Sequence, residues 1–413
     1  MNIAIAGAGI AGLSAAAFLA RAGHRVSVFD KAPAPAAVGS GLIVQPTGQA
    51  ALAALGLTEA LRKRGARLDR LDGRLQGGRR KVLDVRYNAL GPDVFGVSVH
   101  RSVLFDMLHR AAREAGAELN YGHEVESIDD VGAELQLRFS NGASSGPVDL
   151  IIDALGVRSP FVERKNCFLD YGALWANAPF PSAYGFETNV LNQRYRGAGV
   201  SAGVMPIGTL QDGDEPLAAF FWTLRADEFT AWRAAPLTQW KENVLALWPE
   251  AAPVLDHFIS HDQFVFAHYA HHTARAPVEG RVVHIGDAWH AASPQLGQGA
   301  NMALLDAWAL SLALPEAVES SDGVEAALAA FVNMRSAHVK LYQAISYLFT
   351  PVYQSDLKFI PALRDVLAEP LSSIWPMPRI LASLVAGTLG RPLRNLANSD
   401  NTREQSATCS QGE

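Results

Sequence analysis

The chain has 413 residues, enough for about two or three domains, and 49% of them are hydrophobic, which suffices to bury a substantial core. Only 18% are charged, and 35 Lys and Arg against 41 Asp and Glu give a net charge of −6, so no overall positive field favours nucleic acid as a partner. The two cysteines, Cys167 and Cys409, lie far apart in the chain. This separation argues against a disulfide framework or a thiolate metal site and fits a reducing cytoplasm.

The opening residues predict a βαβ unit. Asn2–Ala6 is typical of a short buried strand, about Gly9–Ala22 of a helix, and Arg25–Phe29 of a second strand. No basic residue precedes the apolar run, and three glycines interrupt it in a regular pattern. We therefore interpret this run as neither a secretory signal nor a membrane span.

Helices and strands then alternate as far as about residue 154. The predicted elements are helices over Gln49–Arg64 and Ser102–Ala115 and strands over Glu118–Ile128, Glu134–Phe139 and Asp149–Ala154, with Asn141-Gly142 as a turn.

The chain changes character at about residue 173. Aromatic and β-branched runs at Gly203–Ile207 and Leu217–Leu224 are separated by Gly, Asp and Pro, which predicts an inserted antiparallel sheet. A strand followed by a long helix returns at Arg281–Leu314, and Val324–Thr350 is predicted to be helical. Residues 398–413 are polar and are predicted to form a disordered tail.

A glycine-rich turn joins the first strand to the first helix. Residues 7–12 read G-x-G-x-x-G, a spacing that permits a tight turn, the approach of a pyrophosphate to the backbone, and close packing of helix and strand. Asp30 follows at the end of the second strand, where a carboxylate can receive ribose hydroxyls. These features predict an adenine dinucleotide site and do not separate NAD from FAD. The residues assigned to it are Gly7, Gly9, Ala11, Gly12, Asp30 and Lys31.

A second pattern, far along the chain, separates the two cofactors. Residues 280–290, Gly-Arg-Val-Val-His-Ile-Gly-Asp-Ala-Trp-His, and 294–301, Pro-Gln-Leu-Gly-Gln-Gly-Ala-Asn, resemble the second FAD fingerprint of the p-hydroxybenzoate-hydroxylase-like (class A) flavoprotein monooxygenases. Residues 39–48 resemble that family's loop beside the flavin ring, and residues 100–108 its Arg-x-x-L helix. The resemblance covers most of residues 1–160 and 280–345 and implies FAD as the cofactor.

The resemblance also implies roles for particular residues. Asp287 can accept hydrogen bonds from the ribityl chain, and the helix that opens at Gly297–Asn301 turns its N–H groups toward the pyrimidine part of the flavin. Arg101 is expected near the ribose or phosphates and Val125 near the adenine. The full set implied here is Arg101, Val125, Gly286, Asp287, Gly297, Gln298, Gly299, Ala300 and Asn301.

The expected fold class is therefore α/β. A Rossmann-type FAD-binding domain is expected over residues 1–172 and 263–335, with an inserted antiparallel-sheet substrate domain over 173–262. A C-terminal helical segment is expected over 336–397, followed by the tail at 398–413. One departure from the family pattern matters: Leu155 stands where an aspartate linked to FAD and the pyridine nucleotide is usual, with Asp153 two residues earlier.

In enzymes that this sequence resembles, NADH or NADPH binds transiently and reduces FAD. The reduced flavin then forms a C4a-hydroperoxide with O2 that hydroxylates or epoxidises a substrate. We expect an FAD-dependent monooxygenase for an aromatic or polyketide-like small molecule, with no catalytic side chain assigned. Two alternatives stay open: a flavin-dependent reductase or oxidase on the same fold, which Leu155 favours, and a flavin-binding sensor without turnover.

The apolar strands of the middle sheet suggest a substrate pocket. The alternative, that the same residues form the core of the sheet, stays open. The hypothesis assigns the pocket to Tyr195, Val204, Met205, Phe220 and Trp222, with Pro294 at the flavin edge.

Three further features receive other interpretations. A local group of histidines includes adjacent His271 and His272, which would point to opposite faces of a strand, so no metal site is predicted. The basic stretch Arg62–Lys81 is interpreted as a solvated face in preference to an anion site for NADPH. The apolar stretch Ile374–Gly387 is too short to span a bilayer, and docking on the protein's own core is preferred to membrane association.

Overall fold

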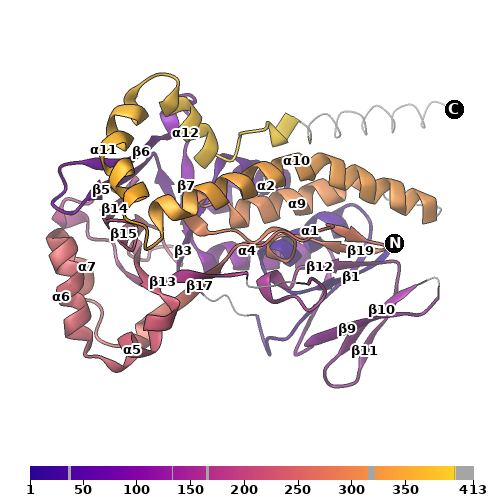
Figure 1. Cartoon of the computed structure of the whole chain (residues 1–413). Helices are drawn as coiled ribbons and strands as arrows, with labels where there is room; N and C mark the ends of the chain where they lie inside the picture. Colours follow the sequence, from indigo (N-terminus) through magenta and orange to yellow (C-terminus); the bar gives the residue numbers. More distant parts are fainter. Residues whose placement is uncertain (36–38, 133, 164–166, 315–320, 395, 397–413) are drawn as a thin grey trace.

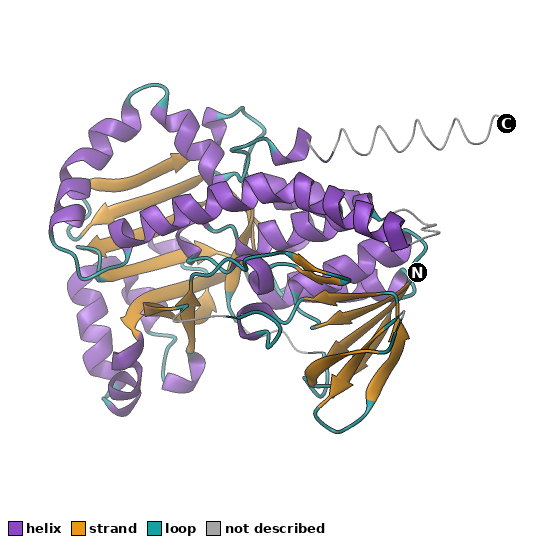
Figure 2. Ribbon diagram, turned by 45° about the vertical axis from the view of Figure 1, so that its right-hand side comes forward, coloured by secondary structure: helices purple, strands orange, loops and turns teal. Residues whose placement is uncertain are grey.

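The computed structural model describes residues 1–413 except 36–38, 133, 164–166, 315–320, 395 and 397–413, so the predicted tail lies outside the described residues. Figure 1 gives the element labels, and Figure 2 shows two groups of strands with a long helix, α10 (Ser321–Tyr353), passing from one to the other. The arrangement is an α/β fold with an attached antiparallel sheet and C-terminal helices, as predicted.

The first group of strands is built on a six-stranded sheet in the order β18-β19-β12-β1-β2-β8. Its strands from β19 to β8 run parallel, and the sequences of β1 and β12 are nearly continuous apolar runs because both faces of the sheet are buried there. The bounds are β1 (Asn2–Ala6), β2 (Arg25–Asp30), β8 (Glu118–Tyr121), β12 (Leu150–Asp153), β18 (Val278–Glu279) and β19 (Val282–His284).

The two faces of this sheet have different covers. Ile3 and Ile5 of β1 belong to the core formed with the helices, whereas Ala4 and Ala6 pack against a three-stranded sheet. Successive side chains on a strand point to opposite faces, so a five-residue strand supplies both layers. The covering elements are α1 (Ile10–Arg21), α4 (Arg101–Glu114) and α9 (Gly299–Ala313) on one side and β9 (Val125–Asp130), β10 (Leu135–Phe139) and β11 (Ser144–Val148) on the other.

Two predicted elements are each split by a glycine with positive φ. The predicted strand over 118–128 is two strands, β8 and β9, which belong to different sheets and are separated by Gly122 at φ +75°. The predicted helix over 49–64 is α2 (Pro46–Ala54) and α3 (Thr58–Arg64), with Gly56 at φ +69° between them. Glycine adopts this left-handed conformation at little cost, so the chain changes direction at both positions.

The second group of strands is a seven-stranded, largely antiparallel sheet in the order β17-β13-β16-β15-β14-β5-β6. The predicted domain bounds of 173–262 were too narrow, because strands from before and after this range complete the sheet. Helices α5 (Phe229–Ala234), α6 (Leu237–Leu247) and α7 (Ala252–Leu255) cover one face. The strands are β5 (Arg70–Leu75), β6 (Lys81–Arg86), β13 (Phe168–Pro179), β14 (Val190–Arg196), β15 (Val200–Pro206), β16 (Leu217–Arg225) and β17 (Val265–Ala270).

The remaining elements connect the two sheets and close the chain. A small sheet, β3 (Gly41–Val44), β7 (Gly96–His100) and β4 (Ala66–Leu68), joins them, and α8 (Asp287–His290) follows β19. The predicted boundary at residue 336 falls inside α10, which is followed by the C-terminal helices α11 (Phe359–Ser373) and α12 (Met377–Val385). In the described part of the chain, no helix combines the length and the apolar character needed to cross a membrane.

Candidate active site

The three glycines of the first turn have different surroundings. At Gly7 φ is +101°, and a Cβ there would lie 2.6 Å from the carbonyl oxygen of Ala154. A Cβ on Gly12 would lie 1.9 Å from the carbonyl oxygen of Gly7, whereas a Cβ on Gly9 would meet no atom within 4 Å. Packing therefore requires the first and third glycines, and the second leaves open space at the N-terminus of α1 where a pyrophosphate can approach free N–H groups.

Asp30 is fixed beside this turn. Its Oδ2 accepts a hydrogen bond from the Ala8 N–H (2.7 Å), and its Oδ1 accepts one from the Ala32 N–H (2.8 Å). Each carboxylate oxygen keeps a second lone pair, which is available to a ribose hydroxyl. The carboxylate is thus positioned at the turn before any ligand arrives.

The other residues predicted to bind the adenine half of the cofactor differ in their exposure and in their ion pairs. Lys31 makes an exposed ion pair with Glu124 at 3.8 Å, and Val125 is buried at the start of β9. Arg101 is exposed at the start of α4, and its guanidinium makes no ion pair with any described residue. A Cβ on Gly39, in the loop before β3, would lie 3.2 Å from the Arg101 Cδ. Arg101 is therefore a cation beside this loop that has no ion-pair partner in the described part of the chain.

The second glycine segment touches the first. Gly286 and Gly297 have φ of +59° and +61°, and a Cβ on Gly286 would lie 2.9 Å from the Cβ of Ala11 in α1. Asp287 follows as the first residue of α8, and its Oδ1 is 3.8 Å from the position of a Cβ on Gly299, which opens α9. Two segments far apart in the sequence thus form one surface.

The Asn301 side chain is bound to the backbone of the neighbouring loops. Its Oδ1 accepts a hydrogen bond from the Gln45 N–H (2.8 Å), and its Nδ2 donates to the carbonyl oxygens of Ile43 (3.0 Å) and Gly297 (2.9 Å). The carboxamide is fully buried. It holds the loop after β3 against α9, because its hydrogen-bonding groups are taken up by the backbone.

Three buried polar atoms around these loops have no hydrogen-bond partner among the described residues: Gln45 Nε2, Ser293 Oγ and Gln298 Oε1. The opposite ends of both amides are bound, since the Tyr87 hydroxyl donates to Gln45 Oε1 (2.5 Å) and Gln298 Nε2 donates to the Val385 carbonyl oxygen (2.6 Å). An unpaired buried polar group lowers the stability of the fold by about 1–3 kcal/mol. The clustering of three such atoms around these loops therefore indicates that a polar ligand binds there. With the open turn at Gly9, the donor and acceptor set fits FAD.

A buried polar network behind Gly286 was missed by the sequence analysis. Asp306 Oδ2 accepts hydrogen bonds from the Gly286 N–H (3.0 Å) and from His290 Nε2 (2.6 Å), and its Oδ1 accepts one from Arg335 Nε (2.8 Å). All three side chains are buried. Asp306 is the one charged residue of α9, and a lone aspartate in an apolar helix was the available signal.

The pKa values of this network follow from burial and charge. Burial opposes ionisation of Asp306, but His290 and Arg335 outweigh it and lower the pKa of Asp306 to about 2. Burial and the Arg335 charge lower the pKa of His338 to about 3. His338 is therefore neutral at pH 7: its Nδ1 accepts from Arg335 (3.0 Å), and its Nε2 donates to the Gly387 carbonyl oxygen (3.0 Å), just beyond α12.

Asp153 does not replace the aspartate that the family has at the position of Leu155. The Asp153 side chain is fully buried, and its Oδ1 accepts from the Leu155 N–H (3.0 Å). Its Oδ2 accepts from the Ser159 hydroxyl (2.6 Å) and from His284 Nδ1 (2.8 Å). The carboxylate is used inside the fold and is not presented to a nucleotide.

The predicted pocket residues divide between the two faces of the seven-stranded sheet. Val204, Phe220 and Trp222 belong to the core under α5–α7, so their assignment to a pocket was wrong. Met205 lies on the opposite face, and the strand register places Tyr195 on that face too. Adjacent residues on a strand point in opposite directions, so Val204 and Met205 cannot line one pocket.

An aromatic shelf that the sequence analysis missed accompanies Met205. Register pairs Phe221 with Gly203 and with Trp175, whose ring centroid is 5.1 Å from that of Phe221. A Cβ on Gly203 would lie 2.1 Å from the Phe221 ring, so this glycine lets the ring lie across the strand. Trp175 Nε1 donates to the Tyr269 hydroxyl (3.2 Å), and burial raises the pKa of Tyr269, which keeps the phenol protonated.

This shelf meets the loop that the sequence predicts beside the flavin. A Cβ on Gly41 would lie 2.9 Å from Met205 Cε, and the Ser40 hydroxyl donates to Asn177 Oδ1 on β13. Pro294 is exposed at the start of a short turn, Pro294–Leu296, that leads into α9. The odd-numbered face of the sheet and the cofactor loops therefore lie against each other.

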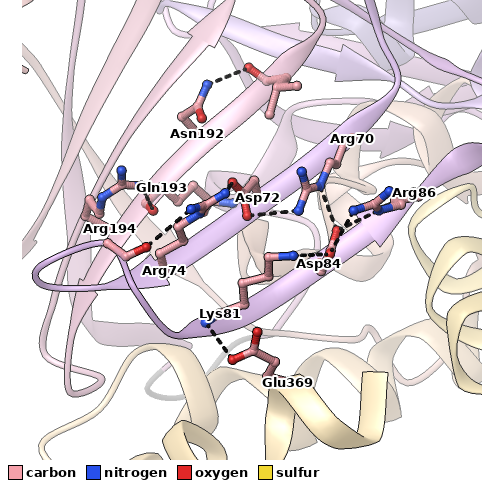
Figure 3. A network of polar contacts seen from close by, with 12 residues as sticks. Arg70, Asp72, Arg74, Lys81, Asp84, Arg86, Asn192, Gln193, Arg194 and Glu369 are labelled. Carbon is pink, nitrogen blue, oxygen red and sulfur yellow. Dashed lines mark hydrogen bonds and ion pairs between the residues drawn. The ribbon is translucent and has the colours of Figure 1, made fainter. Parts of the chain in front are cut away.

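The basic stretch 62–81 contributes to a charge network on β5 and β6 (Figure 3). Asp72 accepts from Arg74 Nε (2.8 Å), and Asp84 accepts from Arg70 Nε (2.7 Å). Burial raises the pKa of Asp84, but hydrogen bonds from Arg70 and Arg86 outweigh it and lower the pKa. The arginines of this network form ion pairs with carboxylates on the same two strands, so the network stabilises the pairing of β5 with β6. Among the described residues, no group of three or more His, Cys, Asp or Glu is placed to hold a metal ion.

Comparison with known proteins identifies the family. The family model described as "FAD binding domain" matches residues 1–344. The chain belongs to this family, that of the class A flavin monooxygenases, and is an FAD-dependent monooxygenase, an oxidoreductase.

Individual relatives agree in length and fold. A salicylate hydroxylase of Pseudomonas putida is 26% identical over 90% of this chain and 91% of its own. An aurachin C monooxygenase/isomerase of Stigmatella aurantiaca is 28% identical over 90% of this chain and 95% of its own. The structure of Klebsiella pneumoniae HpxO with FAD and uric acid superimposes with a TM-score of 0.77 at 21% identity, covering 95% of this chain and 98% of that one.

Proposed function

We propose that this monooxygenase uses NADH or NADPH and O2 to hydroxylate or epoxidise an electron-rich aromatic or polyketide-like small molecule. The observation that carries the proposal is the shelf formed by Trp175, Phe221 and Met205, which faces the cofactor loops. Flat aromatic rings pack well on such a surface by offset stacking. The relatives support the class, since salicylate and 6-hydroxynicotinate, which their names give, are small aromatic acids.

The chain's own residues would hold the cofactor in this proposal. Gly9 and the N-terminus of α1 would receive the pyrophosphate, Asp30 the ribose, and Arg101 would supply a positive charge. Asp287 and the N-terminus of α9 would face the flavin ring and ribityl chain. When bound, FAD supplies electron transfer from NAD(P)H and the activation of O2.

The substrate side would orient the ring and exclude water. The partly buried Phe221 and Trp175 offer apolar surface, backed by the buried Met205, which keeps the reacting atoms dry. The protonated Tyr269 hydroxyl accepts from Trp175 and retains its own proton to donate to a polar substituent of the substrate. A ring with one hydrogen-bond acceptor matches this arrangement.

The test is turnover of the FAD-loaded protein with NADH and with NADPH under oxygen-18, across phenolic acids, hydroxypyridines and quinolones. We expect substrate-stimulated oxidation of the nicotinamide and a product carrying one labelled oxygen atom. Hydrogen peroxide in full yield without labelled product, for every compound, would support the oxidase or reductase alternative. No stimulated oxidation at all would support the sensor.

A further inference from the structure

The charged side chains of helix α11 point toward the rest of the fold and not toward solvent. The Arg364 side chain is only 4% exposed, pairs with Asp365 at 2.6 Å, and donates to two backbone carbonyls at 2.9 Å. Glu369 Oε2 accepts from the backbone N–H of Lys81 at the edge of the sheet, as Figure 3 shows. This is the reverse of an ordinary surface helix, whose charged face points to water.

The opposite side of α11 is apolar and exposed. Phe359, Leu363 and Val366 recur at intervals of four and three, which places them on one stripe of the helix, and Leu371 lies beside this stripe near the helix end. Phe359 is 78% exposed and Val366 60%, and the stripe continues past the helix to Ile374 at 61% and Trp375 at 82%. We call this surface the α11 face; its residues are Phe359, Leu363, Val366, Leu371, Ile374 and Trp375.

A group of exposed apolar side chains of this kind, gathered on one helix and the turn after it, marks an interaction site. Helices α11 and α12 lie next to β6, the edge strand of the seven-stranded sheet, at one end of the molecule in Figure 1. The sequence of residues 397–413 contains no large apolar side chain, so that stretch supplies no apolar group to cover the α11 face.

The exposed charges that flank the α11 face are mainly positive, and the exposed Asp356, just before Lys358, is paired with Arg225. Lys358 precedes the stripe and Arg379 follows it, and both are exposed. Arg80, also exposed, donates to the Asp365 carbonyl oxygen (3.5 Å) and so lies beside the helix. Between residues 357 and 394 the acidic residues are Asp365 and Glu369, whose carboxylates are turned toward the body. The rim is thus positive although the chain as a whole carries −6.

We propose that the α11 face docks on the surface of a lipid bilayer that contains anionic lipids. The apolar stripe and Trp375 would lie at the boundary of headgroups and acyl chains, and Lys358, Arg80 and Arg379 would lie among the phosphates. A two-fold contact between copies of this chain fits less well, because it would bring like-charged rims together. The inference does not depend on which substrate the enzyme oxidises.

The docked helices also reach the active site. Ala382 and Val385 of α12 pack in one cluster with Met205, and Gln298 donates to the Val385 carbonyl oxygen. The element that would rest on the membrane is therefore continuous with the wall of the substrate shelf. A bilayer could then serve as the source of an apolar substrate.

The test is flotation of the full-length, FAD-loaded protein with vesicles of phosphatidylcholine alone and of phosphatidylcholine with phosphatidylglycerol. We expect the protein to float with the anionic vesicles, less so at high salt and less so with the neutral ones. A Phe359→Ser/Trp375→Ser variant should lose binding by about tenfold or more, because both side chains would otherwise enter the interface.

Ile259→Ser is the matched control, since Ile259 is 86% exposed and lies outside the α11 face. It should bind like the unaltered protein, and all variants should keep the same flavin content and melting temperature. Absence of flotation, equal binding to both vesicle types, or undiminished binding by the double variant would overturn the proposal. So would a lipid-free dimer that the double variant converts to monomers, because a second copy would then cover the face.

Discussion

The two faces of the seven-stranded sheet share the same strands and differ in what covers them. The even-numbered residues of β15 and β16, such as Phe220, are sealed under α5–α7 in a continuous aromatic core. The odd-numbered residues, such as Phe221, face the loops that we propose to hold the cofactor and the polar groups behind them. In the proposed function, neighbouring phenylalanines of the same strand therefore serve stability on one side and substrate recognition on the other.

The largest expected effect is on the covered face. Phe220 is fully buried, with its ring 6.0 Å from that of Trp240 and 5.6 Å from that of Phe258. Phe220→Ala should lower the free energy of unfolding by about 3–5 kcal/mol, measured by chemical denaturation, because the cavity cannot fully collapse. The KM of the enzyme that remains folded should not change. A changed KM with little loss of stability would break the distinction between the faces.

Phe221→Ala tests the open face with the adjacent residue. We expect kcat/KM for an accepted substrate to fall about 10- to 100-fold, because the ring supplies apolar surface to the substrate. The loss of stability should be smaller than for Phe220→Ala, which serves as the matched control. If both variants lose stability and neither changes kcat/KM, the shelf is not the substrate site.

We expect a fall in pH to destabilise the buried polar network behind the site before it affects the aromatic core. The pKa of His338 is about 3 in the folded chain and about 6.5 in the unfolded one, so the unfolded chain binds more protons between these values. Stability should be full above pH of about 6.5 and fall as the pH drops, by up to about 1.4 kcal/mol per pH unit. His338→Gln should flatten this slope in melting curves taken across the range; an unchanged slope would contradict the assignment.

The smallest expected effect concerns one hydroxyl. Tyr269→Phe removes the proposed hydrogen bond to the substrate, so KM should rise about three- to tenfold for a substrate with a polar substituent. An analogue without that substituent should bind both proteins equally. An equal rise for both compounds would show that Tyr269 acts only through its packing with Trp175.

The sequence by itself was sufficient for features that depend on nearby residues. The βαβ start, the turn at Gly7 and Gly12, and the second segment around Gly286 were predictable, because backbone conformation and helix–strand packing at each demand a glycine at a fixed spacing. The position of Asp30 follows for the same reason, since the end of the second strand sets where its carboxylate lies. These local patterns predicted a dinucleotide site, and FAD as the cofactor rested on the resemblance of the second segment to a known family.

Only the tertiary structure decided which distant groups meet. Strands β5 and β6 join a sheet whose other strands begin at residue 168, and nothing local to residues 70–86 indicates that partner. Which of Phe220 and Phe221 is buried in the core depends on where α5–α7 pack. The role of Asp306 depends on Arg335, which lies in another helix. The outward apolar stripe of α11 has the same origin. A periodic pattern defines which residues share a face, whereas long-range packing determines which face is buried.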